Sequence, residues 1–167
     1  MDTTFKAILW QQFGAAIDML ENAIVACPDA LWDDHSRRPE FWHVAYHTLF
    51  FLDYYLSESV DTLVPPAPFT LGELDPVGVL PERPYTKVEL QAYLSHGRQR
   101  CRMAIDTMTA KKARERRRFS WGEVSVTELL LYNMRHVQHH AAQPNLILRQ
   151  TIDSAPRWVA KAKQNLS

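Results

Sequence analysis

The sequence predicts an all-α protein, a four-helix bundle with a long proline-rich connection between the second and third helices and a short C-terminal helix. Three segments repeat apolar residues at the three- and four-residue spacing of a helix face, two of them open on a capping box, and a fourth segment is apolar nearly all the way round. Six of the ten prolines gather in one connection. Because 167 residues is the usual size of one domain, we expect a single domain over residues 1–167.

The first two helices are predicted from their apolar residues. The first is expected over about residues 4–26, where Ile17 and Ile24 share one face, and Pro28 stops it. The second is expected over Glu40–Ser57, which is too long for an ordinary strand and is apolar nearly all the way round. Such a helix is buried on more than one side, inside the domain or against a partner, so we expect a homodimer.

The connection that follows, from about residue 58 to residue 85, cannot form a regular helix. Its prolines are Pro65, Pro66, Pro68, Pro76, Pro81 and Pro84. They leave an extended crossover along the surface. A connection this long in a compact domain is usually functional or covers something.

The third helix opens on the capping box Thr86–Glu89. The basic run Lys111–Arg118 follows it and is expected to be a solvated helix end that complements the helix dipole, or else a local anion site. A second capping box, Ser125–Glu128, opens a fourth helix that runs to about Arg149. Pro144 is expected to kink that helix or loosen its hydrogen bonding.

A short terminal helix is expected after Asp153, because Pro156 stands where its first turn would begin. Trp158 and Val159 are its expected apolar anchors.

Composition excludes several classes of protein. The 19 basic residues balance 19 acidic ones, which argues against bulk binding to nucleic acid or to an anionic membrane. No apolar stretch has the length of a spanning helix, and Asp2 stands where a secretory signal would be cationic. Two cysteines, Cys27 and Cys101, fit a reducing cytoplasm rather than a secreted disulfide scaffold.

The seven histidines are the most informative residues. His43 and His47 are four apart on the second helix, and His136 and His140 are four apart on the fourth. This spacing places two side chains on one face of a helix, one turn apart, close enough to share a ligand.

A polar stripe on the fourth helix strengthens the case for a metal. Asn133, His136, His140 and Gln143 fall in one sector beside the apolar face. Burying the ring nitrogens of an imidazole costs free energy unless they have a partner, and a metal ion is such a partner. Three imidazoles with an open fourth position form one of the known arrangements of catalytic zinc sites, although nickel and iron also accept imidazole. The remaining histidines are expected at the surface: His139 on the rim, His35 in a loop, and His96 on the less apolar side of the third helix.

The sequence lacks the motifs of two other kinds of metal site. Val137 stands where the His-Glu-x-x-His motif of zinc proteases needs its glutamate. A di-iron carboxylate bundle needs two Glu-x-x-His motifs, and only Glu40–His43 is present. No glycine pattern marks a nucleophile elbow or a phosphate-binding loop.

The segment FWHVAYHTLFFLDYYL, followed about ninety residues later by RHVQHHAAQPNLILRQ, resembles the DinB-like superfamily over nearly the whole chain. The resemblance implies a four-helix bundle, often dimeric, whose three histidines bind a divalent metal. By position these are His47, His136 and His140, and His43 competes with His47 for the first place. The chain departs from the family pattern at Ala142–Pro144, where Gly-Gln and an apolar residue are usual.

The resemblance also implies chemistry, because some relatives are thiol-dependent S-transferases or isomerases using bacillithiol, mycothiol or glutathione. It predicts a zinc or nickel site, a small-molecule substrate, a low-molecular-weight thiol as a candidate cofactor, and transferase, isomerase or hydrolase activity. Asn133 and Gln143 flank the ligands and are candidates for supporting them or contacting a substrate, as are His43 and His139. The expected pocket walls are Trp42, Tyr54, Trp121 and Tyr132, and the arginine run is a candidate partner for a thiol's carboxylates. The alternative is a non-catalytic, metal-binding or dimerising stress-response protein.

Overall fold

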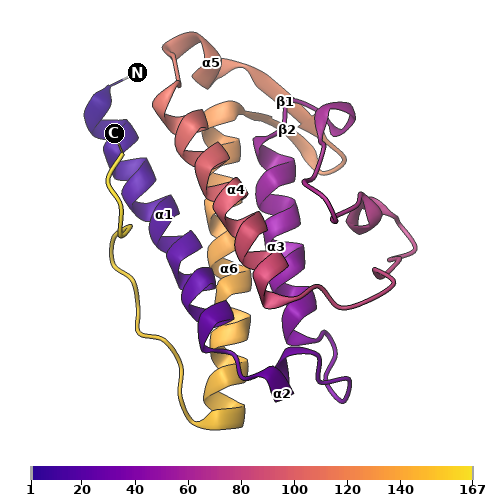
Figure 1. Ribbon diagram of the computed structural model, residues 1–167. Coiled ribbons are helices and arrows are strands. Elements are labelled where there is room, and N and C mark those ends of the chain that lie inside the picture. Colours follow the sequence, from indigo (N-terminus) through magenta and orange to yellow (C-terminus); the bar gives the residue numbers. More distant parts are fainter. Residues whose placement is uncertain (1, 167) are drawn as a thin grey trace.

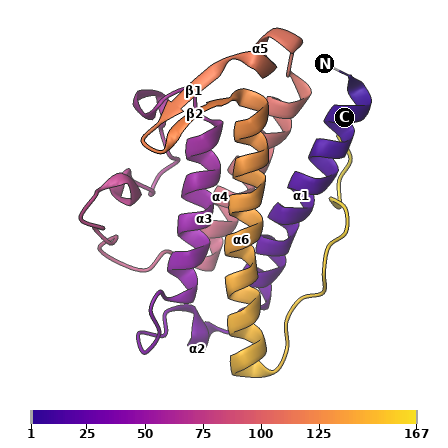
Figure 2. The same ribbon diagram turned by 180° about the vertical axis from the view of Figure 1, so that it is seen from behind.

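The protein is mostly helical, as predicted, in a computed structural model that describes residues 2–166 (Figures 1 and 2). The long helices are α1 (Thr3–Ala26), α3 (Phe41–Leu56), α4 (Lys87–Asp106) and α6 (Val126–Ile152). They lie side by side, and α4 and α6 each pack against both α1 and α3. The short elements of the described chain are α2 (Asp29–Trp32), α5 (Ala110–Arg114), the 3-10 turns Val60–Thr62 and Gly72–Leu74, and the strands β1 (Arg116–Phe119) and β2 (Gly122–Ser125).

Helix α3 is apolar on nearly every side because its own chain covers it. Helices α4 and α6 pack on it, and the connection after it covers a further side. From that connection, buried Phe69 stacks on Tyr46 of α3 and on Tyr93 of α4, with ring centroids 5.8 and 4.3 Å apart. This burial accounts for the composition of α3 without a partner, so the homodimer stays a prediction that this helix does not support.

The helix ends largely follow the sequence signals. Both halves of the Thr86–Glu89 capping box are present at the start of α4, and the Ser125 side chain caps α6. Helix α6 continues through the buried Pro144 to Ile152, three residues beyond the predicted end. Since proline has no N–H, the carbonyl of His140 lacks its usual helical donor.

The basic run after α4 is not the helix end that we expected. It forms the short helix α5 and then β1, which pairs antiparallel with β2 so that Arg116 faces Ser125. Both Arg116 and Arg118 form ion pairs with Glu123 on the opposite strand. Ion pairs between strands stabilise a hairpin. The three- and four-residue repeat of apolar residues, from which the helices were predicted, does not reveal such pairs.

The predicted C-terminal helix is also wrong. Residues 154–166 have no regular secondary structure and run back along α1 (Figures 1 and 2). The Ala162 N–H donates to the carbonyl of Gln11 at 2.9 Å, and the Lys163 N–H donates to Asp18 Oδ2 at 2.8 Å. Partners on α1 therefore replace the hydrogen bonds that a helix would supply. Trp158 is 68% exposed and is not an anchor, whereas Val159 packs against the core.

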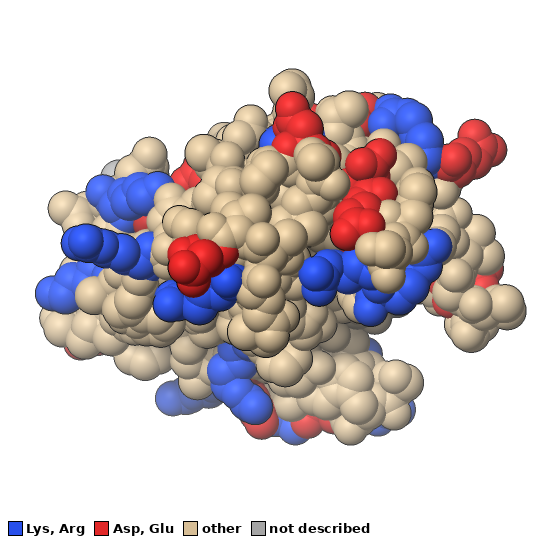
Figure 3. All heavy atoms as spheres, turned by 90° about the horizontal axis from the view of Figure 1, so that it is seen from below, with Lys and Arg blue, Asp and Glu red and all other residues tan. Residues whose placement is uncertain are grey.

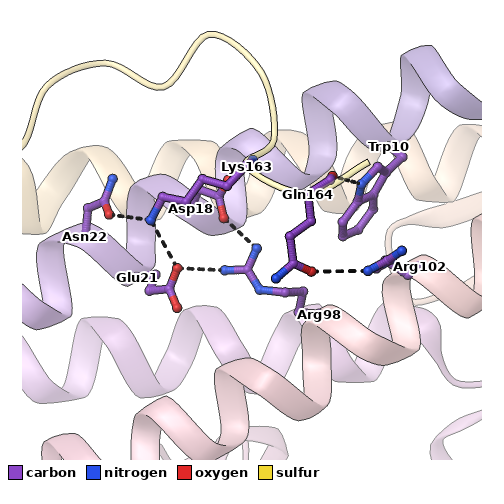
Figure 4. Close-up of polar contacts among 8 residues, drawn as sticks. All are labelled: Trp10, Asp18, Glu21, Asn22, Arg98, Arg102, Lys163 and Gln164. Atoms are coloured by element: carbon purple, nitrogen blue, oxygen red, sulfur yellow. Dashed lines mark hydrogen bonds and ion pairs between the residues drawn. The ribbon is translucent and has the colours of Figure 1, made fainter. Parts of the chain in front are cut away.

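A polar network fixes this C-terminal strap, residues 154–166, between α1 and α4 (Figure 4). The fully buried Asp18 accepts from the strap backbone and pairs with Arg98 of α4, which also contacts Glu21 at 3.0 Å. The indole of Trp10 donates to the carbonyl of Gln164 at 2.7 Å. The buried Asp18 thus holds the strap against α1 and, through Arg98, holds α1 against α4.

The surface carries both charges. Figure 3 shows basic and acidic side chains dispersed over one end of the molecule, with neutral surface between them. None of the described helices combines the length and the apolar character that crossing a membrane requires.

Replacing Asp18 by alanine is expected to lower the free energy of unfolding by about 3 kcal/mol, because it removes the buried partner of Arg98, which then keeps only the partly exposed Glu21, and leaves the Lys163 N–H of the strap without its acceptor. Urea denaturation measures the change. Asp33→Ala, which removes an exposed acid, is the control and should stay within about 0.5 kcal/mol of the unmodified protein. A loss for Asp18→Ala no larger than that of the control would contradict the role of the network.

Candidate metal centre

Three histidines from two helices converge between α3 and α6. His47, His136 and His140 each offer a ring nitrogen, and these nitrogens all lie within 4.8 Å of one another. The ring centroid of His47 is 5.5 Å from that of His136 and 4.7 Å from that of His140, and the centroids of the two α6 rings are 4.4 Å apart. The four-residue spacing on α6 supplies two of the rings, and packing of α3 against α6 supplies the third.

His43 does not join this cluster. One turn before His47 on α3, its Nε2 instead lies 3.0 Å from Glu73 Oε1. The structure therefore brings His47, rather than its competitor, to the pair on α6.

Glu73 is the residue of this site that the sequence analysis missed. It lies in the 3-10 turn Gly72–Leu74 of the long connection, and its side chain is only 8% exposed. Its Oε2 is 2.8 Å from His47 Nδ1, so one carboxylate contacts both histidines of α3. Although burial opposes ionisation, hydrogen bonds from His43 and His47 lower the pKa of Glu73 to about 2. The sequence did offer one signal for Glu73: it is an acidic residue in a connection long enough to cover the histidine pair.

The two histidines of α6 are uncharged near neutral pH. Burial, followed by the neighbouring imidazoles, lowers the pKa of His136 to about 3. Burial also lowers the pKa of His140 to about 4, and the nearby His47 acts in the same direction. Neutral imidazole is the form that binds a metal, so both side chains are ready to act as ligands.

The residues flanking the cluster have different environments. Asn133 is fully buried, and its amide donates to the carbonyl of Leu52 at 2.9 Å, which ties α6 to the backbone of α3. Gln143 Nε2 lies 3.4 Å from Nε2 of His139, which is exposed on the rim as expected. Asn133 thus supports the helix pair, whereas Gln143 and His139 lie at the outer edge of the site.

Of the two histidines expected at the surface away from the site, one is placed correctly. His35 is exposed, with its Nδ1 3.3 Å from Glu40. His96 is half-buried, and its Nε2 lies 3.7 Å from the buried Asp53, so the prediction for this residue was wrong. The reason is tertiary, since α4 turns this polar side toward an acid of α3.

Aromatic rings form one wall of the site. Phe51 and Tyr55 of α3 contact the ring of His136, with centroids 5.5 and 5.8 Å away. Tyr132 contacts Tyr55 and stacks on Trp121 of the hairpin turn, which is 45% exposed. The wall therefore extends from the solvent to the histidines. Tyr54 contacts Phe51, whereas Trp42 contacts His43 and lies outside the wall.

A cavity of about 540 Å³ adjoins α6 on the side of the strap. Its lining comes from α1, α6 and the strap: Gln12, Ala15, Ala16, Tyr132, Met134, Arg135, His136, Gln138, His139, Trp158 and Val159. Because His136 is part of the lining, the cavity reaches one member of the cluster. Its volume is within the range of small-molecule sites.

Comparison with known protein families identifies the family of this chain. A family model described as the DinB superfamily matches residues 12–143, well over half of the sequence. The chain belongs to the DinB superfamily. No curated protein matches it.

The DinB match includes all three clustered histidines and Glu73, and it ends at Gln143. The last turns of α6 and the strap lie outside it. The histidine cluster is thus within the family portion of the chain, while the strap wall of the cavity lies beyond the match.

Acid is expected to destabilise this DinB protein in its metal-free form between pH 6.5 and 4.5. The pKa values of His136 and His140 lie below the ordinary 6.5, so in this range the unfolded chain binds protons that the folded chain does not. Glu73 contributes only below about pH 4.5, since its pKa is lowered from that value. Urea denaturation at several pH values in the presence of a chelator measures the effect.

The matched variant is His136→Asn, which removes one titrating group. Its free energy of unfolding should fall less steeply from pH 6.5 to pH 4.5 than that of the unmodified protein. Equal slopes for the two proteins would show that His136 titrates normally in the folded state.

Proposed function

We propose that this DinB-superfamily protein binds one divalent metal ion, zinc or nickel, through His47, His136 and His140, and uses it in a reaction on a small molecule. The observation that carries the proposal is the convergence of the three ring nitrogens within 4.8 Å of one another. Two helices packed together hold them, so little rearrangement is needed to bind an ion.

Further features of the site fit a metal. The buried Nδ1 of His136 has no hydrogen-bond partner among the described residues, and a polar atom in that state costs free energy. The low pKa values of His136 and His140 mean that an ion need not displace protons from them at neutral pH. An all-imidazole set suits zinc and nickel better than magnesium or calcium, which prefer oxygen ligands.

A divalent ion held by these three histidines would have room for one further ligand, such as a water or a thiol. It would supply Lewis acidity, which would lower the pKa of that ligand toward neutrality. The rings of Phe51 and Tyr55 cover one side of His136, and Tyr132, which contacts Tyr55, also lines the cavity. The cavity beside His136 has room for a small molecule. These features support a transferase, isomerase or hydrolase with water or a low-molecular-weight thiol as the nucleophile.

Metal analysis of the purified protein tests the site. The unmodified protein should carry about one zinc or nickel ion per chain, and the His136→Ala/His140→Ala variant should carry almost none. His139→Ala, which removes an exposed histidine from the same turn of α6, is the control and should keep its ion. Less than about half an ion per chain in the unmodified protein would contradict the proposal.

Activity is tested separately. A panel of low-molecular-weight thiols with electrophilic acceptors, and a panel of hydrolysable esters and amides, should show turnover that depends on the bound ion. Stoichiometric metal with no turnover on either panel would instead favour a non-catalytic metal-binding protein. A cytoplasmic location and a homodimer stay predictions.

A further inference from the structure

We propose that Glu73 is a positioning residue of the metal centre, which holds His47 with its Nδ1 protonated and its Nε2 free to bind the ion. This inference rests on the proposed function and extends it to a residue of the proline-rich connection. Glu73 is not one of the three residues whose ligand atoms converge.

The direction of the hydrogen bond defines the role. His47 Nδ1 lies 2.8 Å from Glu73 Oε2, and an ionised carboxylate can only accept. The proton of a neutral His47 therefore sits on Nδ1, and the lone pair is on Nε2, at the opposite side of the ring. A carboxylate behind a ligating histidine fixes the orientation of the ring and makes its free nitrogen more basic.

Charge gives a second reason. Three neutral imidazoles leave both positive charges of a divalent ion uncompensated in a half-buried site. Glu73 supplies one negative charge through His47, and its side chain is only 8% exposed, so water screens that charge weakly. Among the described residues, neither His136 nor His140 has a hydrogen-bonded carboxylate, so this support reaches the cluster only through α3.

The connection is built to hold Glu73 in place. Phe69 is buried against Tyr93, and the Tyr46 hydroxyl donates to the carbonyl of Thr70 at 3.2 Å. Both anchors lie within four residues of Glu73. His43 contacts its second oxygen at 3.0 Å, so the carboxylate is held from two sides. The acid thus reaches the histidines from a fixed segment rather than from a free loop.

Two near-isosteric variants test the role. Glu73→Gln removes the charge at the site, and Glu82→Gln removes the same charge from an exposed position of the same connection. Zinc affinity is measured on both variants and on the unmodified protein by competition with a chromophoric chelator. We expect zinc to bind roughly 10- to 100-fold more weakly to Glu73→Gln and within about twofold of the unmodified value to Glu82→Gln.

A spectroscopic readout separates positioning from general destabilisation. In the metal-free protein, nitrogen NMR of the imidazoles should show His47 as the Nδ1-protonated tautomer, and Glu73→Gln should convert this signal into a mixture of tautomers. Thermal unfolding of the metal-free variants checks that both are folded at the temperature of the titration.

The outcomes are distinct. Zinc binding that is equal in Glu73→Gln and the unmodified protein, or a His47 already protonated on Nε2, overturns the role of Glu73 while leaving the metal site intact. Failure of the unmodified protein to bind zinc or nickel overturns the proposed function, and the positioning role with it. The inference is supported if Glu73→Gln, but not Glu82→Gln, binds zinc more weakly and shows a mixture of His47 tautomers.

Discussion

The packing of α3 against α6 is the contact on which the rest of the site depends. Each helix alone carries imidazoles one turn apart, and only their contact brings His47 within reach of His136 and His140. The fully buried Asn133 fixes this contact through its hydrogen bond to the carbonyl of Leu52. Because a buried amide is costly without a partner, this bond favours one register of the two helices over its neighbours.

Two long connecting or terminal segments, which are not part of the long helices, complete the core, the histidine site and the cavity. The connection after α3 buries Phe69 in the core and brings Glu73 to the histidines. The C-terminal strap covers α1, pairs its backbone with Asp18, and forms one wall of the cavity beside His136. In both segments, partners on the long helices satisfy backbone and side-chain groups that the segments themselves do not.

Features of this protein that depend on neighbouring residues were predictable from the sequence, and those that depend on distant residues were not. The long helices, the capping box at Thr86 and the exposed His139 follow from local periodicity and local hydrogen bonds. The hairpin was missed because its strands are short, and ion pairs between Arg116, Arg118 and Glu123 join residues that a helix does not bring together. Glu73 was missed for a similar reason, since it is 26 residues from His47 and no periodicity connects them.

The sequence by itself determined the helical class, the long helices and the pairing of histidines on α3 and α6, because these depend on a repeat of about 3.6 residues. It also carried enough of the family pattern to indicate the DinB superfamily, which the family match established. The resemblance named His47 with His43 as its competitor, and the tertiary structure decided between them. It alone decided that Glu73 lies behind His47 and that the C-terminus is a strap. These features depend on the rotation of one helix against another and on partners far apart in the chain, which local patterns do not encode.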